Sequence, residues 1–405
     1  MEGTPLDGVR ILALEQMQAL PFATQLLARL GADVVKIEST HGDQGRTALP
    51  AITDPDGRTV GATFLRNNLN KRSVCVDLKN PRGRDLVLGL APHFDVVAEN
   101  SRPGAMAKLG LGYEDIVAVH PTVVYLSVSG FGNSVPSPYR EWPAFASIVE
   151  SMSGIYEMKR PEGRPPTMAP VGALGDISAA LFATIGVLAA LRQRDLTGKS
   201  QYIDIAMLDS VVAMTDIVTN FWSMGIRRDP DRDLRNPVIL DSFRASDGWL
   251  MLQVSRRHQF ERFADLLGRP DWKDDARLAT PWGWADHAED LIRPAVEQWA
   301  AGLTKLEAAS QLAAAGIAAA PCNGPDDVVR DPHVRDHHML VEIPRFDGVE
   351  QPVLGAGNPV KLSAMPDQPN GHVPRLGEDT DAVLDELLGL DEGEITRLRE
   401  AGVVG

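Results

Sequence analysis

Cysteine and positive charge are scarce in this chain. The only cysteines among 405 residues, Cys75 and Cys322, make neither a disulfide framework nor a CxxC pair for zinc or redox chemistry, so a reducing, cytoplasmic setting is expected. The chain carries 40 Lys and Arg against 55 Asp and Glu, a net charge of −15, which argues against a nucleic-acid partner. A polyanionic ligand would need a local cluster of positive charge.

Long hydrophobic runs are also absent. The N-terminal sequence MEGTPLDGVR lacks the apolar core of a signal peptide. The longest apolar stretch, 177–191, is interrupted by Ser178, Thr184 and Gly186 and falls short of the roughly 20 residues that a membrane span needs. It is predicted to be a buried core helix, and no membrane partner is expected.

The first half of the chain alternates β-rich runs with helical patterns. Strands are predicted at 9–15, 33–38, 73–78, 95–100 and 122–130, and helices at about 21–30, 83–90 and 105–119. Serial strand–helix–strand units predict an α/β fold with a doubly wound parallel sheet. Ligands bind such sheets beyond the carboxyl ends of the strands, which directs attention to segments 16–21, 38–46, 100–108 and 129–139.

Glycine is missing from the turn after the first strand. This turn reads EQMQALP, whereas a dinucleotide-binding fold has a glycine-rich fingerprint at this place. A nicotinamide-dependent dehydrogenase is therefore disfavoured. The histidines also show no metal-ligand spacing, since His337 and His338 are adjacent and face different ways, so no metal site is expected.

The character of the chain changes near residue 175. Two long apolar helices are predicted on either side of a strand, and a charged break at 227–235 follows. The run WLMLQV at 249–254 then opens a smaller domain, with helices at about 259–267, 291–302 and 305–315. The chain ends in a helix-rich tail.

Several side chains could carry chemistry. Asp176 precedes an apolar helix, where the helix dipole favours a carboxylate, and Gly175 could let a substrate approach; an ordinary N-cap is the alternative. The amide of Gln18 could bind a carbonyl or carboxylate, and Glu141 could act as a base. Basic residues near strand ends could hold phosphates, with solvated surface charge as the alternative: Lys71, Arg72, Arg102 and Lys108.

Together these segments resemble the class III CoA-transferases, which include formyl-CoA transferase and carnitine CoA-transferase. The resemblance covers nearly the whole chain through a series of segments in the family's order. These are PLDGVRIL (5–12), LARLGADVVKIE (27–38), NKRSVCVDLKNPRG (70–83), VVAENSRPGAMAKLGLGYEDI (96–116), YLSVSGFG (125–132), GALGDISAALFATIGVLAALRQRDLTGKSQYIDIAMLDS (172–210), LGRPDWKDD (267–275), GIAAAPCNGPDDVVRDPHV (316–334) and LGEDTDAVL (376–384).

The resemblance implies a Rossmann-like large domain (1–225), a small α/β domain (226–325), a return to the large domain (326–405) and an interlocked homodimer. It implies that Asp176 is the nucleophile and that Gln18 lies near the reacting carboxylate. The implied CoA contacts are Lys71, Arg72, Asn100, Ser101, Arg102, Lys108 and Phe131. Acyl-CoA and a small carboxylic acid are then the substrates, with no permanently bound cofactor.

The sequence departs from the formyl-CoA branch at three places, which argues against oxalate as the acceptor. The stretch RDLRNPVILDSF lacks that branch's glycine-rich loop, Phe131 replaces a tyrosine, and Ala48 replaces a tryptophan. The same fold hosts α-methylacyl-CoA racemases, but no histidine lies between His120 and His258 to supply their catalytic imidazole. Racemase and non-catalytic CoA-binding protein remain the alternatives.

The implied reaction is covalent. Asp176 attacks a thioester to give a mixed anhydride, and CoA thiolate then converts the anhydride to an aspartyl-CoA thioester. Succinyl-CoA is a common donor in the family. Arg46 or Arg140 could pair with the second carboxylate of a dicarboxylic acceptor, with a surface role as the alternative for each.

Overall fold

The computed structural model describes residues 3–157, 160, 163–168, 170–225, 238–363, 365 and 371–405. The chain divides into two compact units, Met1–Ile226 with Arg335–Gly405, and Arg227–Val334. The charged break predicted at 227–235 lies outside the described residues.

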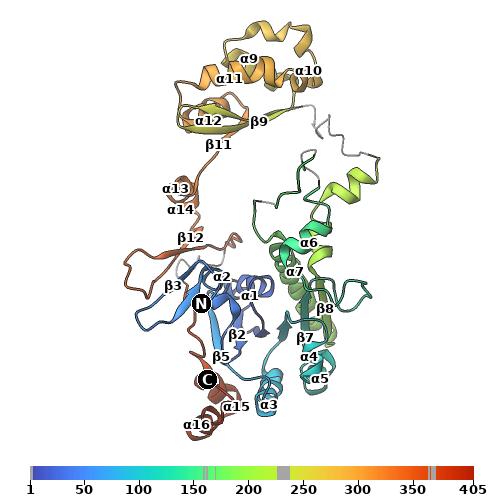
Figure 1. Cartoon of the computed structure of the whole chain (residues 1–405), viewed down its shortest axis with the longest axis vertical. Helices are drawn as coiled ribbons and strands as arrows, with labels where there is room; N and C mark the ends of the chain where they lie inside the picture. Colours follow the sequence, from blue (N-terminus) through green and yellow to red (C-terminus); the bar gives the residue numbers. More distant parts are fainter. Residues whose placement is uncertain are drawn as a thin grey trace. The chain divides into compact units, whose positions relative to one another are not determined.

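A six-stranded sheet forms the centre of the first unit (Figure 1). In spatial order its strands are β5 (Lys71–Cys75), β2 (Asp33–Glu38), β1 (Arg10–Leu14), β6 (Val96–Glu99), β7 (Val124–Ser129) and β8 (Gln201–Ala206). Every neighbouring pair is parallel, with Leu12 of β1 opposite Val35 and Val97. Counted among these strands alone, the order is 3-2-1-4-5-6, as in Rossmann folds, and the predicted parallel sheet is confirmed.

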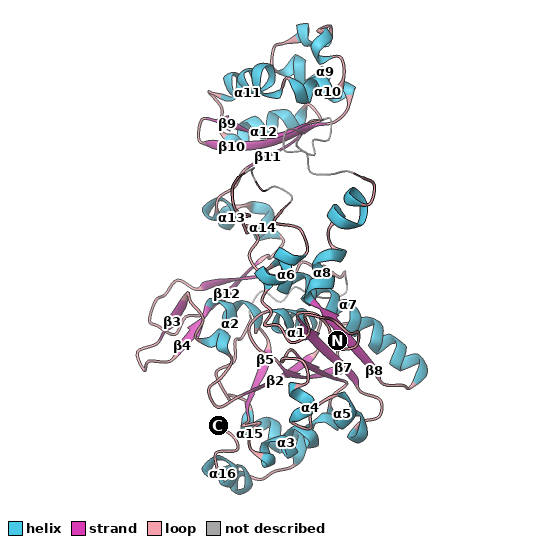
Figure 2. Cartoon of the chain, turned by 45° about the vertical axis from the view of Figure 1, so that its right-hand side comes forward, coloured by secondary structure: helices cyan, strands magenta, loops and turns pink. Residues whose placement is uncertain are grey.

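Apolar side chains cover both faces of this sheet. Ile11 and Ala13 of β1 face one core, and Leu12 and Leu14 face the other, because successive side chains of a strand alternate. The first core is closed by α1 (Ala19–Arg29), α6 (Ala146–Met152), α7 (Leu174–Thr197) and α8 (Met207–Ala213). The second is closed by α3 (Pro81–Leu90), α4 (Ala105–Lys108), α5 (Tyr113–Val119), α15 (Thr380–Leu388) and α16 (Glu392–Glu400) (Figure 2).

The C-terminal segment packs on the edge of the same sheet. The Asp379 N–H donates to the Ser73 carbonyl at 2.9 Å, and the Ser73 N–H donates to the Asp379 carboxylate at 2.8 Å. Val404 forms an antiparallel bridge with Val76 just beyond β5. Residues from both ends of the chain therefore build one unit.

The structure differs from the sequence expectations at local breaks. The helix predicted at 105–119 is two helices, because Gly110, with a φ of 71°, ends α4. The strand predicted at 73–78 begins at Lys71, which places Lys71 and Arg72 inside the sheet. The hairpin of β3 (Ala51–Thr53) and β4 (Thr59–Gly61) and the short helix α2 (Ala62–Asn67) were not predicted.

Helix α7 has 24 residues, and by length and composition it could cross a membrane, since its most apolar window has a mean hydropathy of 1.9. Half of that window is buried inside the structure, where α7 packs on α1, α6 and α8. This burial agrees with the predicted core helix. Four large apolar residues of α7 are exposed: Leu181, Ile185, Leu188 and Leu196.

The second unit is a small α/β module. Its antiparallel sheet runs β11 (Ala318–Pro321), β10 (Gly248–Val254) and β9 (Ile239–Ala245), and the predicted strand 249–254 is its central strand. Buried Phe260, Trp272 and Trp284 lie in its core. Its principal helices are α9 (Arg257–Leu266), α10 (Pro281–Asp286), α11 (Arg293–Ala300), α12 (Lys305–Ala314) and α13 (Pro325–Arg330). Helix α14 (Pro332–Asp336) spans the boundary between the units, and the hairpin of β12 (Leu340–Ile343) and β13 (Val353–Ala356) belongs to the first unit.

Candidate active site

Asp176 lies in the first turn of α7. The N-cap of this helix is Ala173, in the left-handed region with a φ of 53°, so Asp176 is the third helical residue and the N-cap alternative is wrong. Its carboxylate is half-buried and makes no hydrogen bond with any described residue. A half-buried carboxylate without donors is poorly stabilised as an ion, which favours reactivity over a structural role.

Two charged neighbours act on Asp176. Burial and the negative charge of Glu150 raise the pKa of Asp176 to about 6, while the positive charge of Arg66 lowers it. The helix dipole favours the carboxylate form as well. Asp176 is therefore mostly ionised at neutral pH, as a nucleophile must be.

Glu150 joins α6 to the start of α7. Its buried carboxylate accepts the Gly175 N–H at 2.9 Å through Oε1 and the Tyr156 hydroxyl through Oε2. Gly175 has a packing role here, because a Cβ at this position would lie 2.8 Å from Val149 and 3.0 Å from the Cα of Ala146. The structure thus explains Gly175 by the close approach of α6, in place of the substrate approach expected from sequence.

Gln18 follows β1 and begins α1, the helix that packs on α7. Its Nε2 is buried and has no hydrogen-bond partner among the described residues. Such a donor is costly to bury unless something binds it. The preceding Met17 has a φ of 63°, and its N–H donates to Asp43 Oδ1 at 2.9 Å, which fixes the turn that presents Gln18.

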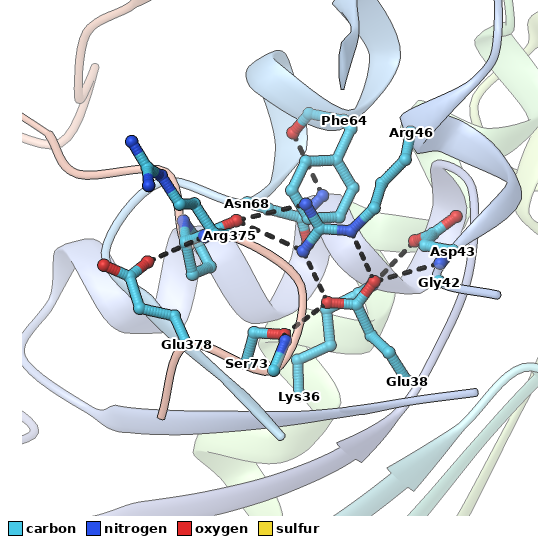
Figure 3. A network of polar contacts seen from close by, with 12 residues as sticks. Lys36, Glu38, Gly42, Asp43, Arg46, Phe64, Asn68, Ser73, Arg375 and Glu378 are labelled. Carbon is cyan, nitrogen blue, oxygen red and sulfur yellow. Dashed lines mark hydrogen bonds and ion pairs between the residues drawn. The ribbon is translucent and has the colours of Figure 1, made fainter. Parts of the chain in front are cut away.

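A buried ion network lies at the carboxyl ends of β1 and β2. Lys36 Nζ is 2.7 Å from Asp43 Oδ2 and 3.5 Å from Glu15 Oε1, and its side chain is 0% exposed. Beside this pair, the Arg46 guanidinium binds both oxygens of Glu38, at 2.6 and 2.7 Å, and lies over the Phe64 ring (Figure 3). The network holds Asp43, and through Asp43 it holds the backbone of Met17.

Lys71 belongs to the same network. Its buried ammonium contacts Glu15 Oε1 at 2.5 Å, Asn68 Oδ1 at 3.0 Å and the Pro21 carbonyl at 2.9 Å. All three of its protons have acceptors, so this ammonium has none left for a phosphate. Lys71 is therefore not expected to contact a CoA phosphate.

Four of the remaining predicted CoA contacts lie in or after the loop that follows β6. The Asn100 amide exchanges two 2.9 Å hydrogen bonds with the backbone of Gln16, which ties the loops after β6 and β1 together, and Ser101 N–H donates to Glu99. Arg102 and Lys108 are exposed around α4, in the segment that follows this loop. Loops after β1 and β6 meet where the strand order reverses, the usual ligand position in such sheets.

Arg72 and Phe131 are already engaged. Arg72 is partly buried and faces Asp33, Asp379 and Glu386 at 3.5, 4.0 and 3.0 Å. Phe131 is buried in the core below the loop after β7, with its ring centroid 5.7 Å from that of Tyr139. Among the described residues, no group of three or more His, Cys, Asp or Glu side chains could hold a metal ion.

Arg66 was not predicted from the sequence. It lies near the end of α2, half-buried, with its guanidinium 5.2 Å from the centroid of the Phe22 ring. Arg46, one of the two arginines suggested for a second carboxylate, is instead bound to Glu38, and Arg140 is exposed. No sequence signal separates Arg66 from other arginines, because its closeness to Asp176 arises only when α1, α2 and α7 pack together.

Comparisons with known proteins agree with this geometry. The model of CoA-transferase family III matches residues 6–380, and the chain belongs to this family. It is 34% identical to the succinyl-CoA–L-malate CoA-transferase beta subunit of Chloroflexus aurantiacus, over 100% of both chains. It is 32% identical to the succinyl-CoA:mesaconate CoA-transferase of Haloarcula hispanica, over 94% of this chain and 96% of that protein.

The fold is similar to a solved structure as well. A CAIB/BAIF family protein from Brucella suis superposes with a TM-score of 0.83 at 30% identity, over 95% of this chain and 100% of that one. The sequence-based family assignment is confirmed, and the chain is an enzyme that transfers CoA between an acyl-CoA and a carboxylic acid. The racemase and non-catalytic alternatives are disfavoured.

Proposed function

We propose that Asp176 is the covalent nucleophile of this CoA-transferase and that its substrates are dicarboxylic acids and their CoA thioesters. The observation that carries the proposal is the half-buried Asp176 carboxylate, which has no hydrogen-bond partner among the described residues and a pKa raised to about 6. The dicarboxylate class is suggested by the relatives, whose names specify succinyl-CoA, L-malate and mesaconate.

The reaction begins at the thioester. An Asp176 oxygen attacks the acyl carbonyl, the C–S bond breaks, and CoA leaves as the thiolate, giving a mixed anhydride. The thiolate then attacks the aspartyl carbonyl and releases the donor acid, which leaves an aspartyl-CoA thioester. The acceptor carboxylate repeats the two steps in reverse, so no water, proton or redox partner is consumed.

Two groups of residues support these steps. The unpartnered Nε2 of Gln18 can donate to the oxyanion that develops at each tetrahedral stage. Arg102 and Lys108, both exposed after β6, can bind CoA phosphates, with Asn100 and Ser101 shaping the loop beneath. Arg72 contributes less, because three carboxylates already surround it.

The test is to trap the intermediate. The enzyme is incubated with succinyl-CoA and hydroxylamine without an acceptor, and its peptides are examined by mass spectrometry. Hydroxylamine displaces CoA or succinate from an aspartyl intermediate, so a hydroxamate on Asp176 is expected. A modification on another residue would refute the assignment, and so would an unmodified enzyme that still exchanges free succinate with succinyl-CoA.

The acid limb of the pH–rate profile should reflect the ionisation of the Asp176 carboxylate. Because only the ionised carboxylate attacks, kcat/KM for succinyl-CoA is expected to fall about tenfold per pH unit below about pH 6. Glu150→Gln removes the like charge but keeps an acceptor for the Gly175 N–H, so the limb should move to lower pH.

Glu114→Gln, an exposed glutamate on α5, is the matched control and should leave the limb in place. A limb that stays unchanged in Glu150→Gln would mean that the charge of Glu150 does not act on Asp176.

We also propose that a second copy of this chain covers the exposed apolar residues of α7. Leu181, Ile185 and Leu188 are spaced along one helix face and are 42, 60 and 37% exposed. The family resemblance implies that the two copies interlock. Light scattering should then give twice the chain mass of 43.9 kDa, and a monomer mass would contradict the proposal.

A further inference from the structure

Arg66 has no directly paired anion among the described residues. Among the described residues it makes no ion pair and no hydrogen bond, whereas Arg46 and Arg72 of the same unit are each paired with carboxylates. Its guanidinium is half-buried against the Phe22 ring, which holds it in place while its N–H donors remain available. Arginine in such a setting is suited to bidentate recognition of a carboxylate.

Helix packing brings together the three elements that carry Arg66, Gln18 and Asp176. Phe22 lies one turn after Gln18 on α1, and its N–H donates to the Gln18 carbonyl at 2.9 Å. Helix α1 packs on both α2, which carries Arg66, and α7, which carries Asp176. Arg66 is close enough to lower the pKa of Asp176, yet the two form no ion pair.

Because the two side chains are not paired with each other, both charges are available to a ligand. An acyl group bound with its thioester carbonyl at Asp176 and Gln18 extends away from the reacting bond, and a carboxylate at its far end would be next to Arg66. A monocarboxylic acyl group of the same length has nothing for the guanidinium to bind. It would also bury the cation unpaired, which is unfavourable.

We propose that Arg66 binds the distal carboxylate of a short dicarboxylic acyl group and thereby selects dicarboxylic over monocarboxylic substrates. The proposal rests on the proposed function, because Asp176 is taken as the reacting group. It does not depend on which dicarboxylic acid is used. The same guanidinium serves donor and acceptor, since both occupy this site in turn.

The test compares a dicarboxylic and a monocarboxylic substrate pair on the full-length enzyme. The dicarboxylic pair is succinyl-CoA with isotopically labelled succinate, and the monocarboxylic pair, of similar size, is butyryl-CoA with isotopically labelled butyrate. Assays are run at pH 8, where Asp176 stays ionised even when a neighbouring positive charge is removed. If butyryl-CoA is not turned over, its competitive inhibition constant against succinyl-CoA replaces kcat/KM.

Arg66→Ala is expected to lower kcat/KM for the dicarboxylic pair by about 10–100-fold, the usual value of a charge-assisted hydrogen bond, and to leave the butyryl-CoA parameter unchanged or improved. Arg66→Lys should recover part of the loss, because an ammonium keeps the charge but not the bidentate geometry. Arg82→Ala, an exposed arginine of α3, is the matched control and should change neither pair.

An equal loss for both pairs would overturn the proposal, because Arg66 would then act on Asp176 or on CoA. No loss for either pair would overturn it as well. A failure of the proposed function gives a different result. In that case the unaltered enzyme forms no hydroxamate on Asp176, whichever substrate pair it prefers.

Discussion

Replacing Asp176 with asparagine is expected to reduce kcat for CoA transfer by about 10⁴-fold or more. The reason is chemical: an amide has no anionic oxygen to attack the thioester and cannot become the acyl carrier. The change is nearly isosteric, and Asp176 makes no hydrogen bond with any described residue, so the fold should not suffer. Initial rates of succinate exchange into succinyl-CoA measure the effect.

Deamidation is the expected source of any residual activity in Asp176→Asn. Deamidation of the introduced asparagine would regenerate the aspartate, so Asp176→Ala is measured in parallel and should show no such recovery. Asp85→Asn, an exposed aspartate on α3, should retain full turnover. If Asp176→Ala keeps more than a few per cent of the wild-type rate, the covalent mechanism is wrong.

Replacing Lys36 with methionine is expected to lower the free energy of unfolding by about 3–5 kcal/mol. Two ammonium groups and two carboxylates balance in the buried network, Lys36 and Lys71 against Glu15 and Asp43. Removing Lys36 leaves two buried carboxylates with one cation. The positive charge of Lys36 also holds the pKa of Asp43 below its usual range, against the opposing effect of burial.

Urea unfolding followed by circular dichroism measures this loss. Lys79→Met removes an exposed lysine and should change stability by no more than about 0.5 kcal/mol. A second readout follows from the contact between Asp43 and the Met17 N–H, which fixes the turn before Gln18. The folded fraction of Lys36→Met should therefore show a lowered kcat. A loss of stability below about 1 kcal/mol would mean that the network relaxes or admits water.

The parallel sheet could be predicted from sequence because its signal is local. β1, β2, β6 and β7 are short runs rich in Val, Ile and Leu, and strands buried on both faces have that composition. The limits of β5 were predicted less well. Lys71 and Arg72 are charged, so the predicted strand began after them, at residue 73. The start of this strand was missed because lysine is rarely buried without a partner, and the partner of Lys71 is known only from the structure.

The sequence by itself determined the kind of fold, the family and the acidic residue that heads α7, because each rests on a pattern of neighbours along the chain. Only the tertiary structure decided what surrounds that acid. Glu150 and Arg66 come from two different helices, and the effect of each on Asp176 depends on distances that folding sets. Electrostatic interaction weakens as the distance between two charges grows, and the separation of two residues along the sequence does not give that distance. For the same reason Lys71, which sequence placed at a phosphate, is a buried partner of Glu15.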